Sequence, residues 1–492
     1  MSLSSISLSG INSQEAEHYH ESNSSRRNSK WVIDVKEELE KMDKLNEVDH
    51  WEKKCIYQIP ACIKDLNKKA YEPQAVSFGP YHHGEDHLNQ MEKHKHRALL
   101  HFLRRSNKPI ESYIDALHRV GKHLIASYDW LDEANNDYRD QYGNCSDQFL
   151  QLMMLDGCFM LEILQTATGT VNDYAFNDPI FSYRESLYIM PYIRRDMLML
   201  QNQLPMLLLD TLLAVETGGA GSTTTGGKPK NKEFLNRIII QFCTQKKSIL
   251  SLGKCLHVVD VYRKHLLQGP RRKLLQTHLR GIDDHGESSF DVIRPARELY
   301  EAGIRFKTSK TTSLRDISFQ GGVLRLPVIV VDDTTESNFL NLMAYERFRV
   351  GPGNDVTAYI FFMDKIIVSD KDVSLLHSKG IIQNAFGSHK EVAKLFNELS
   401  KDVSRMSLDP DSSLDMVHKN VNDYCKKKWN EWRANLIHTY FRSPWAILSV
   451  IAALLLMALA FAQTMYTIYP YYHPRSDSTK AVPRPPPSSL RH

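Results

Sequence analysis

The sequence lacks the short motifs that mark most enzyme classes. It contains no CxxC pair, no HExxH, no GxSxG, no protein-kinase set and no dinucleotide-binding fingerprint. The segment GSTTTGGKPK imitates a phosphate-binding loop, but Pro229 follows Lys228 where that loop needs Ser or Thr. We therefore expect no enzyme of these classes and no bound cofactor.

The sequence also lacks an excess of one charge. Lys and Arg total 62 and Asp and Glu total 58, which leaves a formal net charge of +4. A protein whose main partner is nucleic acid usually has a stronger basic bias. We therefore expect no nucleic-acid partner.

Disulfide spacing and a secretion signal are missing as well. The cysteine count is odd, and the N-terminal segment MSLSSISLSGINSQEAEHYH has neither a basic start nor an apolar run. These features favour reduced thiols in a cytosolic compartment. The seven cysteines are scattered along the chain, at Cys55, Cys62, Cys145, Cys158, Cys243, Cys255 and Cys425.

One long apolar run is present near the C-terminus. From Trp445 through Leu455 to Met465 the chain reads WAILSVIAALLLMALAFAQTM, with no charged residue. About 20 such residues at about 1.5 Å each form a helix of roughly 30 Å, the thickness of one bilayer core. We therefore expect a single transmembrane helix over residues 445–465, with the lipid bilayer as a partner.

Charges on the two sides of this run predict its orientation. Five basic residues precede it and two follow it nearby, which places the large N-terminal region in the cytoplasm of a plasma-membrane or endomembrane protein. Asn23 and Asn144 match the glycosylation acceptor pattern and would carry glycan only if that region were lumenal. The basic residues are Lys426, Lys427, Lys428, Arg433 and Arg442 before the run, and Arg475 and Lys480 after it.

Composition divides the chain into seven parts. The expected ordered blocks have helical spacing of apolar residues, and the basic run KKKWNEWR before the span is expected to contact anionic headgroups. The parts are a disordered N-terminus (1–30), a first helical block (31–215), a Gly/Thr-rich linker (216–233), a second block with a small β element (234–424), a juxtamembrane helix (425–444), the span (445–465) and a Pro-rich tail (466–492).

Two segments predict buried helices because apolar residues occupy nearly every face. SDQFLQLMMLDGCFMLEILQ has Ser146 or Asp147 as its N-cap. RRDMLMLQNQLPMLLLDTLL holds Pro205, which predicts a kink that frees the carbonyl of Gln201. The amides of Gln201, Asn202 and Gln203 are expected to satisfy the groups that the kink frees.

A strand pattern follows in LRDISFQGGVLRLPVIVVDDTTE. Alternation in RDISF, the pair Gly321-Gly322 and the run VLRLPVIVV predict a β-hairpin, with Pro327 at an edge or a bulge. The fold class expected is therefore mainly α, with a small β-hairpin, as one large helical domain plus one transmembrane helix.

The segment SFGPYHHG and the run after it are rich in histidine. Gly79-Pro80 predicts a turn that presents Tyr81, His82 and His83 for recognition, before Gly84. A metal site is the alternative, because imidazoles and carboxylates bind zinc. However, the later histidines of the run, His94, His96 and His101, do not share one helical face.

Several motifs in order resemble the plant family called domain of unknown function 247. They include IYQIPACIKDLNKKAYEPQAVSFGPYHHGEDHLNQMEKHKHRALLHFL, MMLDGCFMLEIL with Asp156-Gly157, QNQLP, GVLRLPVIVVDD and NLMAYERF. The resemblance covers roughly residues 31–465. It implies a plant protein with one C-terminal membrane helix, and it establishes no catalytic residues.

The resemblance also implies a class of function. Some members of the family are implicated in grass pollen self-incompatibility as recognition determinants. The leading hypothesis rests on the large helical domain, the lone span and the absence of a catalytic constellation. It is a membrane-anchored recognition or signalling protein whose partner is a protein or peptide, with a second copy of the chain as one option. The alternative is a membrane-bound, metal-dependent hydrolase that uses the region from His82 to His96.

Overall fold

The computed structural model describes most of the two expected blocks and the apolar helix. The described residues are 31–33, 35–36, 39, 52–129, 138, 145–218, 231–246, 251–269, 293–401, 413–430, 433 and 444–472. Predictions for residues 1–30, for 219–230 of the linker, for most of the juxtamembrane helix and for the tail after residue 472 lie outside these ranges. Asn23 and Asn144 lie outside them too.

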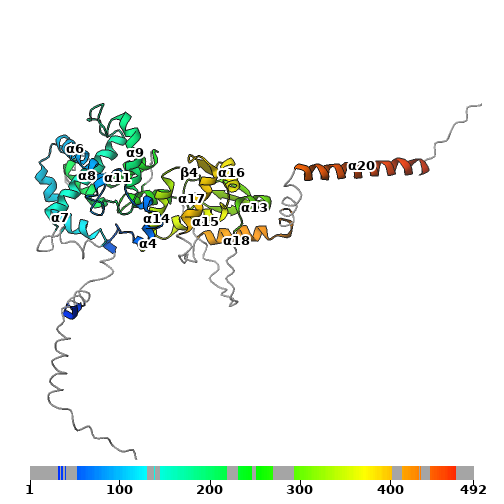
Figure 1. The fold of residues 1–492 in the computed structure, drawn as a ribbon, viewed down its shortest axis with the longest axis horizontal. Helices are drawn as coiled ribbons and strands as arrows, with labels where there is room; N and C mark the ends of the chain where they lie inside the picture. The colour runs from blue at the N-terminus through cyan, green and yellow to red at the C-terminus, as the bar shows by residue number, and fades with distance from the viewer. Residues whose placement is uncertain are drawn as a thin grey trace, which may run out of the picture.

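The described chain forms two lobes, each around its own hydrophobic core (Figure 1). We call the part drawn mainly in cyan and green the first lobe, and the part drawn mainly in yellow the second lobe. The helices of the first lobe are α6 (Asn89–Ser106), α7 (Ile110–Ala126), α8 (Asp147–Ala167), α9 (Tyr183–Met197), α10 (Met206–Glu216) and α11 (Asn231–Thr244), with a short 3-10 helix at Asp86–Leu88.

The second lobe combines helices with five short strands. Its helices are α13 (Ala296–Glu301), α14 (Thr335–Phe348), α15 (Asp355–Ile366), α16 (Asp370–Ser378), α17 (His389–Lys401) and α18 (Ser413–Cys425). Its strands are β1 (Arg305–Thr308), β2 (Ser318–Gln320), β3 (Val323–Leu326), β4 (Ile329–Val331) and β5 (Ile382–Asn384). The expected fold class, mainly α with a small β element, is confirmed.

The predicted hairpin is present, but its second arm is shorter than expected. β2 and β3 pair antiparallel across Gly321 and Gly322, which have φ values of 57° and 73°. β3 also pairs parallel with β1, whereas β4 leaves this sheet and pairs parallel with β5. Pro327 separates β3 from β4, because proline has no N–H to donate to a ladder. The run VLRLPVIVV is therefore two strands in two sheets.

The prediction of a kinked helix around Pro205 is wrong. α9 ends at Met197, and α10 begins at Met206 with Pro205 as its N-cap residue. Pro191 does lie inside a helix, in α9. Proline favours the start of a helix because its missing N–H would have no partner there.

Residues 61–71 precede the helices of the first lobe in the sequence, but they pack in the core of the second lobe. The short helices α4 (Ala61–Lys64) and α5 (Lys68–Tyr71) place Ile63, Ala70 and Tyr71 in the core of the second lobe. The Ser337 hydroxyl and the Asn341 amide of α14 both donate to the Ala70 carbonyl, at 2.8 Å each. Residues 61–71 are therefore a built-in part of the second lobe.

Two other elements differ from the expected blocks. α11 follows the predicted linker but packs into the core of the first lobe, through Leu235 and Ile239 among others. α12 (Val258–Leu266) lies between the cores, with Val258 and Val261 in the first and Val259 in the second. Side chains on opposite faces of one helix thus tie the lobes together.

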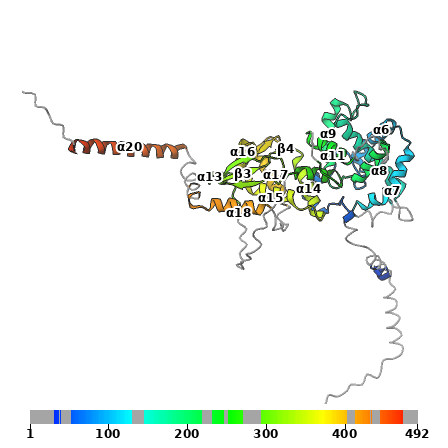
Figure 2. The ribbon, with the colours of Figure 1, turned by 180° about the vertical axis from the view of Figure 1, so that it is seen from behind.

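Among the residues that the structure describes, two helices are long and apolar enough to cross a membrane, and they differ in burial. α8 is largely buried in the first lobe, as predicted, and the Ser146 hydroxyl caps it by accepting from the amide of Phe149 at 3.3 Å. α20 (Pro444–Tyr472) contains the apolar stretch Leu448–Tyr469, none of which is buried. Trp445, Leu455 and Met465 are all exposed on α20, which Figures 1 and 2 draw clear of both lobes.

Candidate functional site

The structure brings three of the sequence motifs together at the loop of residues 76–79. The Asp156 carboxylate of α8 accepts a hydrogen bond from the Gly79 amide at 2.8 Å. The Asn202 side chain accepts from the Phe78 amide at 2.6 Å and donates to the Val76 carbonyl at 2.9 Å. The first part of SFGPYHHG is therefore held by MMLDGCF from one side and by QNQLP from the other.

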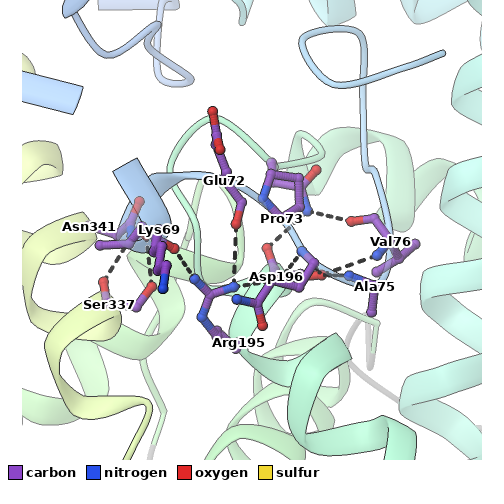
Figure 3. A network of polar contacts seen from close by, with 12 residues as sticks. Lys69, Glu72, Pro73, Ala75, Val76, Arg195, Asp196, Ser337 and Asn341 are labelled. Carbon is purple, nitrogen blue, oxygen red and sulfur yellow. Dashed lines mark hydrogen bonds and ion pairs between the residues drawn. The ribbon is translucent and has the colours of Figure 1, made fainter. Parts of the chain in front are cut away.

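A second carboxylate holds the segment just before this loop. Asp196, at the end of α9, accepts from the backbone amides of Gln74, Ala75 and Val76 at distances of 2.6–3.1 Å (Figure 3). Burial raises the pKa of Asp196 to about 6, and the three amides oppose that rise. The neighbouring Arg195 guanidinium donates to the Glu72 carbonyl at 3.3 Å and also to that of Lys69.

A buried lysine neutralises Asp156. The Lys95 ammonium of α6 is fully buried and lies 2.7 Å from Asp156, 2.6 Å from Glu92 and 3.0 Å from the Ser77 hydroxyl. Burial raises the pKa of Asp156, and the nearby Lys95 ammonium lowers it. Removing one member of such a pair leaves a buried charge uncompensated, which costs about 3–5 kcal/mol.

Gly79 is required where the loop passes closest to QNQLP. Its φ is 73°, and an added Cβ would lie 2.9 Å from the Gln203 carbonyl and 2.8 Å from the Tyr128 hydroxyl. That hydroxyl donates to the same Gln203 carbonyl at 3.0 Å. A side chain at residue 79 would therefore break a buried hydrogen bond.

The side-chain amides of Asn202 and Gln203 satisfy backbone groups, but not those expected from a kink, and the buried Oε1 of Gln201 has no hydrogen-bond partner within the described ranges. The Gln203 side chain donates to the carbonyls of Met197 and Met199 at 2.6 and 2.7 Å, and accepts from the Val259 amide at 3.1 Å. Asn202 donates to the Asp196 carbonyl at 3.0 Å. These residues close the end of α9 and join it to α12.

Gly157 allows α10 to lie close to α8, because an added Cβ at Gly157 would lie 2.6 Å from the Leu212 side chain.

The expectation that the turn presents both histidines is wrong for one of them. His82 is buried, and its Nδ1 lies 2.7 Å from Glu85 Oε1. Burial lowers the pKa of His82, and Glu85 opposes that shift. His83 and Gly84 are exposed, whereas Tyr81 is half-buried and its hydroxyl donates to the Asp129 carbonyl.

The histidines further along α6 have different surroundings. His101 stacks on Tyr174 with ring centroids 4.3 Å apart, whereas His96 is exposed. Within the described ranges, no group of three His, Cys, Asp or Glu side chains is placed to hold a metal ion. Burial raises the pKa of the Cys158 thiol far above its usual value, so this thiol stays protonated.

The motif residues therefore position the backbone. Their carboxylates and amides bind main-chain groups or each other inside the protein, and His83 and Gly84 are the members that reach the surface. Sequence reasoning missed Lys95, Arg195 and Asp196. The adjacent opposite charges of Arg195-Asp196 in an apolar run were a usable signal, because a charge among core residues needs a partner.

A model of the plant family of unknown function called DUF247 matches residues 56–459, from the segment before α4 into α20. The chain belongs to this family. Among DUF247-like relatives, the UPF0481 protein At3g47200 of Arabidopsis thaliana is 32% identical over 456 residues, which cover 88% of this chain and 90% of the relative. A second Arabidopsis protein, UPF0481 protein At3g02645, is 22% identical over 533 residues, which cover 90% and 95%. No solved structure matches this DUF247 chain.

Proposed function

We propose that this protein is a membrane-anchored recognition protein that binds a protein partner through an exposed face of α9. That face carries Leu187, Tyr188, Pro191 and Tyr192, and the exposed fractions of Leu187, Tyr188 and Tyr192 are 61%, 71% and 52%. We call these four residues the α9 stripe. Leu187 and Pro191 are four residues apart, as are Tyr188 and Tyr192, so each pair lies side by side on the helix.

The opposite side of α9 packs into the first lobe, which leaves the α9 stripe exposed to solvent. Met190, Ile193 and Met197 are buried in the core of the first lobe and fix the helix. The stripe is therefore a rigid apolar surface, and tyrosines on such surfaces contribute strongly to protein–protein binding. The partner that suits it is a protein or peptide segment with apolar side chains of its own.

Anchoring rests on α20. Its exposed apolar stretch Leu448–Tyr469 supports a bilayer as the second partner. The charge bias in the sequence favours a cytoplasmic position for the two lobes. Signalling in self-incompatibility stays a prediction from the family resemblance. The alternative of a metal-dependent hydrolase stays a prediction from the histidine-rich region His82 to His96.

Proximity labelling in plant cells tests the proposal. The full chain carries the labelling enzyme at its N-terminus, and the double change Tyr188→Ser and Tyr192→Ser removes both aromatic rings. We expect the double variant to lose at least one labelled protein that the unchanged chain and the control Leu100→Ser retain. Leu100 is a matched control because it is an exposed apolar residue on α6.

Identical labelled sets for the unchanged chain and the double variant would refute a role for the α9 stripe. If the protein that is lost is a second copy of this chain, the partner is the protein itself. Equal membrane abundance of all three chains is the control for folding and anchoring.

A further inference from the structure

A basic groove lies on the surface of the second lobe, between α13 and α16. Its volume is about 450 Å³, within the size range of small-molecule sites. Residues three or four positions apart on each helix face the groove. They are Arg297, Tyr300 and Glu301 of α13, and Lys371, Ser374 and Ser378 of α16.

A third cation comes from the segment that leads to the membrane helix. Arg433 also lines the groove, and it approaches the chain at Gly303, where an added Cβ would lie 2.9 Å from its Nη1. Gly303 has φ 98°, a conformation that favours glycine. This conformation ends α13, because the amides of Gly303 and Ile304 donate to the carbonyls of Tyr300 and Leu299. The guanidinium of Arg433 lies in the space that a side chain at Gly303 would occupy.

The groove has a surplus of positive charge. Three cations (Arg297, Lys371 and Arg433) line it with one carboxylate, Glu301, which leaves +2. Glu301 lies 3.2 Å from Arg297 Nε, so it neutralises that residue. Within the part of the chain that the structure describes, Lys371 and Arg433 form no ion pair.

A buried carboxylate keeps the two helices in place. Asp372 accepts from the Arg297 amide at 2.9 Å and from the Ser369 hydroxyl at 2.8 Å. It is buried beneath the groove and satisfied by these contacts at the starts of α13 and α16. Arg297 and Lys371 are therefore held near each other by the fold itself.

We propose that this groove binds a phosphate monoester, the chemistry shared by a phosphorylated lipid headgroup and a soluble inositol phosphate. Guanidinium and ammonium groups bind phosphate oxygens by charge-assisted hydrogen bonds, and the hydroxyls of Ser374 and Ser378 add neutral donors. The ring of Tyr300 supplies an apolar wall for the carbon skeleton of the ligand.

The location favours a lipid as the source. Arg433 precedes Pro444, the first residue of α20, by 11 positions, so the two Cα atoms lie within about 40 Å of each other. The groove is then within reach of the headgroups wherever α20 spans a bilayer. This assignment of source rests on the proposed anchoring, whereas the phosphate chemistry does not.

Binding by the full chain in dodecyl maltoside micelles tests the proposal. The probes are dioctanoyl phosphatidylinositol 4-phosphate, soluble inositol 1,4-bisphosphate and dioctanoyl phosphatidylinositol, which lacks the monoester. We expect both phosphorylated probes to bind more tightly than the third. Lys371→Gln and Arg433→Gln should each weaken binding about fivefold, which corresponds to about 1 kcal/mol per basic residue.

Lys310→Gln is the matched control, because Lys310 is an exposed lysine of the same lobe outside the groove. Its affinity should stay within about twofold of the unchanged chain. Equal weakening by all three variants, or absence of binding by the unchanged chain, would overturn the proposal. Tenfold tighter binding of the phosphorylated lipid than of the soluble headgroup assigns the lipid source, and equal affinity assigns the soluble one.

The α9 double variant separates this proposal from the proposed function. Its affinity for inositol 1,4-bisphosphate should equal that of the unchanged chain, since α9 belongs to the other lobe. Loss of protein labelling with normal phosphate binding supports both proposals. Normal labelling with normal phosphate binding refutes only the role of the α9 stripe.

Discussion

Gly79 and Gly84 form a matched pair of sites for substitution. Together they test how closely the loop of residues 76–79 approaches QNQLP. Both have positive φ, but only Gly79 has neighbours where a Cβ would lie. Gly84→Ala should cost about 1 kcal/mol of backbone strain. Gly79→Ala should cost about 3 kcal/mol, since it also displaces the Tyr128 hydroxyl from the Gln203 carbonyl.

The measurement is the midpoint of thermal unfolding of the full chain in detergent. The midpoint of the Gly79→Ala variant should fall several degrees below that of the Gly84→Ala variant. Equal midpoints would show that the Gln203 carbonyl moves aside at no cost.

His257 provides a test of pH dependence. It is the N-cap of α12, and its Nδ1 accepts from the Asp260 amide at 3.4 Å, which requires a neutral ring. Burial lowers its pKa from 6.5 to about 4, with Asp260 opposing and Arg349 adding to the shift. Between pH 6.5 and 4 the unfolded chain therefore binds a proton that the folded chain excludes.

Stability is consequently lost as the pH falls through this window. From pH 7.5 to pH 5 the loss caused by His257 should be about 2 kcal/mol. His257→Asn keeps a good N-cap but removes the titrating ring, so the melting midpoint of this variant should fall less on acidification. An identical acid-induced fall in both chains would mean that His257 is protonated when folded.

At the level of helices, α8 and α20 show what sequence predicts and what it leaves open. Both are apolar and long enough to cross a membrane, but α8 carries Asp156 and Glu162, whereas the apolar stretch of α20 has no charged residue and a higher mean hydropathy. Packing agrees with this difference, because α8 is largely buried and the apolar stretch of α20 is not. The N-cap Ser146, the Gly321-Gly322 turn and the apolar span were predictable, because each depends on nearby residues. The partners of Lys95 and Asp196 were not, since they lie 61 and about 120 positions away.

Pro205 illustrates the same limit. Proline is unfavourable in a helix interior, but an apolar pattern on both sides favoured one long kinked helix. The contacts that end α9 come from side chains of Asn202 and Gln203 that also reach Val76 and Val259. Local pattern alone does not contain those distant backbone groups.

Changes at the centre of α20 test whether it enters a membrane. Leu455→Arg with Leu459→Arg should cost about 6–8 kcal/mol, which exceeds the roughly 3–5 kcal/mol by which the apolar side chains favour insertion. The variant should be released from plant membranes by alkaline carbonate, whereas Leu455→Val with Leu459→Val should remain. Retention of the arginine variant would refute insertion of α20.

For the whole molecule, orientation decides which compartment the two lobes face. The change Pro487→Asn places a glycosylation acceptor, N-S-S, at residues 487–489 of the tail. If the lobes are cytoplasmic, this variant should gain a glycan that endoglycosidase removes, and the unchanged chain should carry none. A glycan on the unchanged chain that is lost in Asn23→Gln or Asn144→Gln would reverse the orientation.

The contact of α5 with α14 joins two segments that the ribosome makes at different times. Tyr71 leaves the ribosome about 260 residues before Thr335, the first residue of α14. At about 5–20 residues per second, residues 61–71 wait roughly 15–50 seconds for that partner. The first lobe, encoded between them, has time to fold while Ile63 and Tyr71 are still uncovered. A chain truncated before α14 would thus expose the apolar side chains of residues 61–71 beside a folded first lobe. We expect chaperones or proteases to recognise this exposed segment.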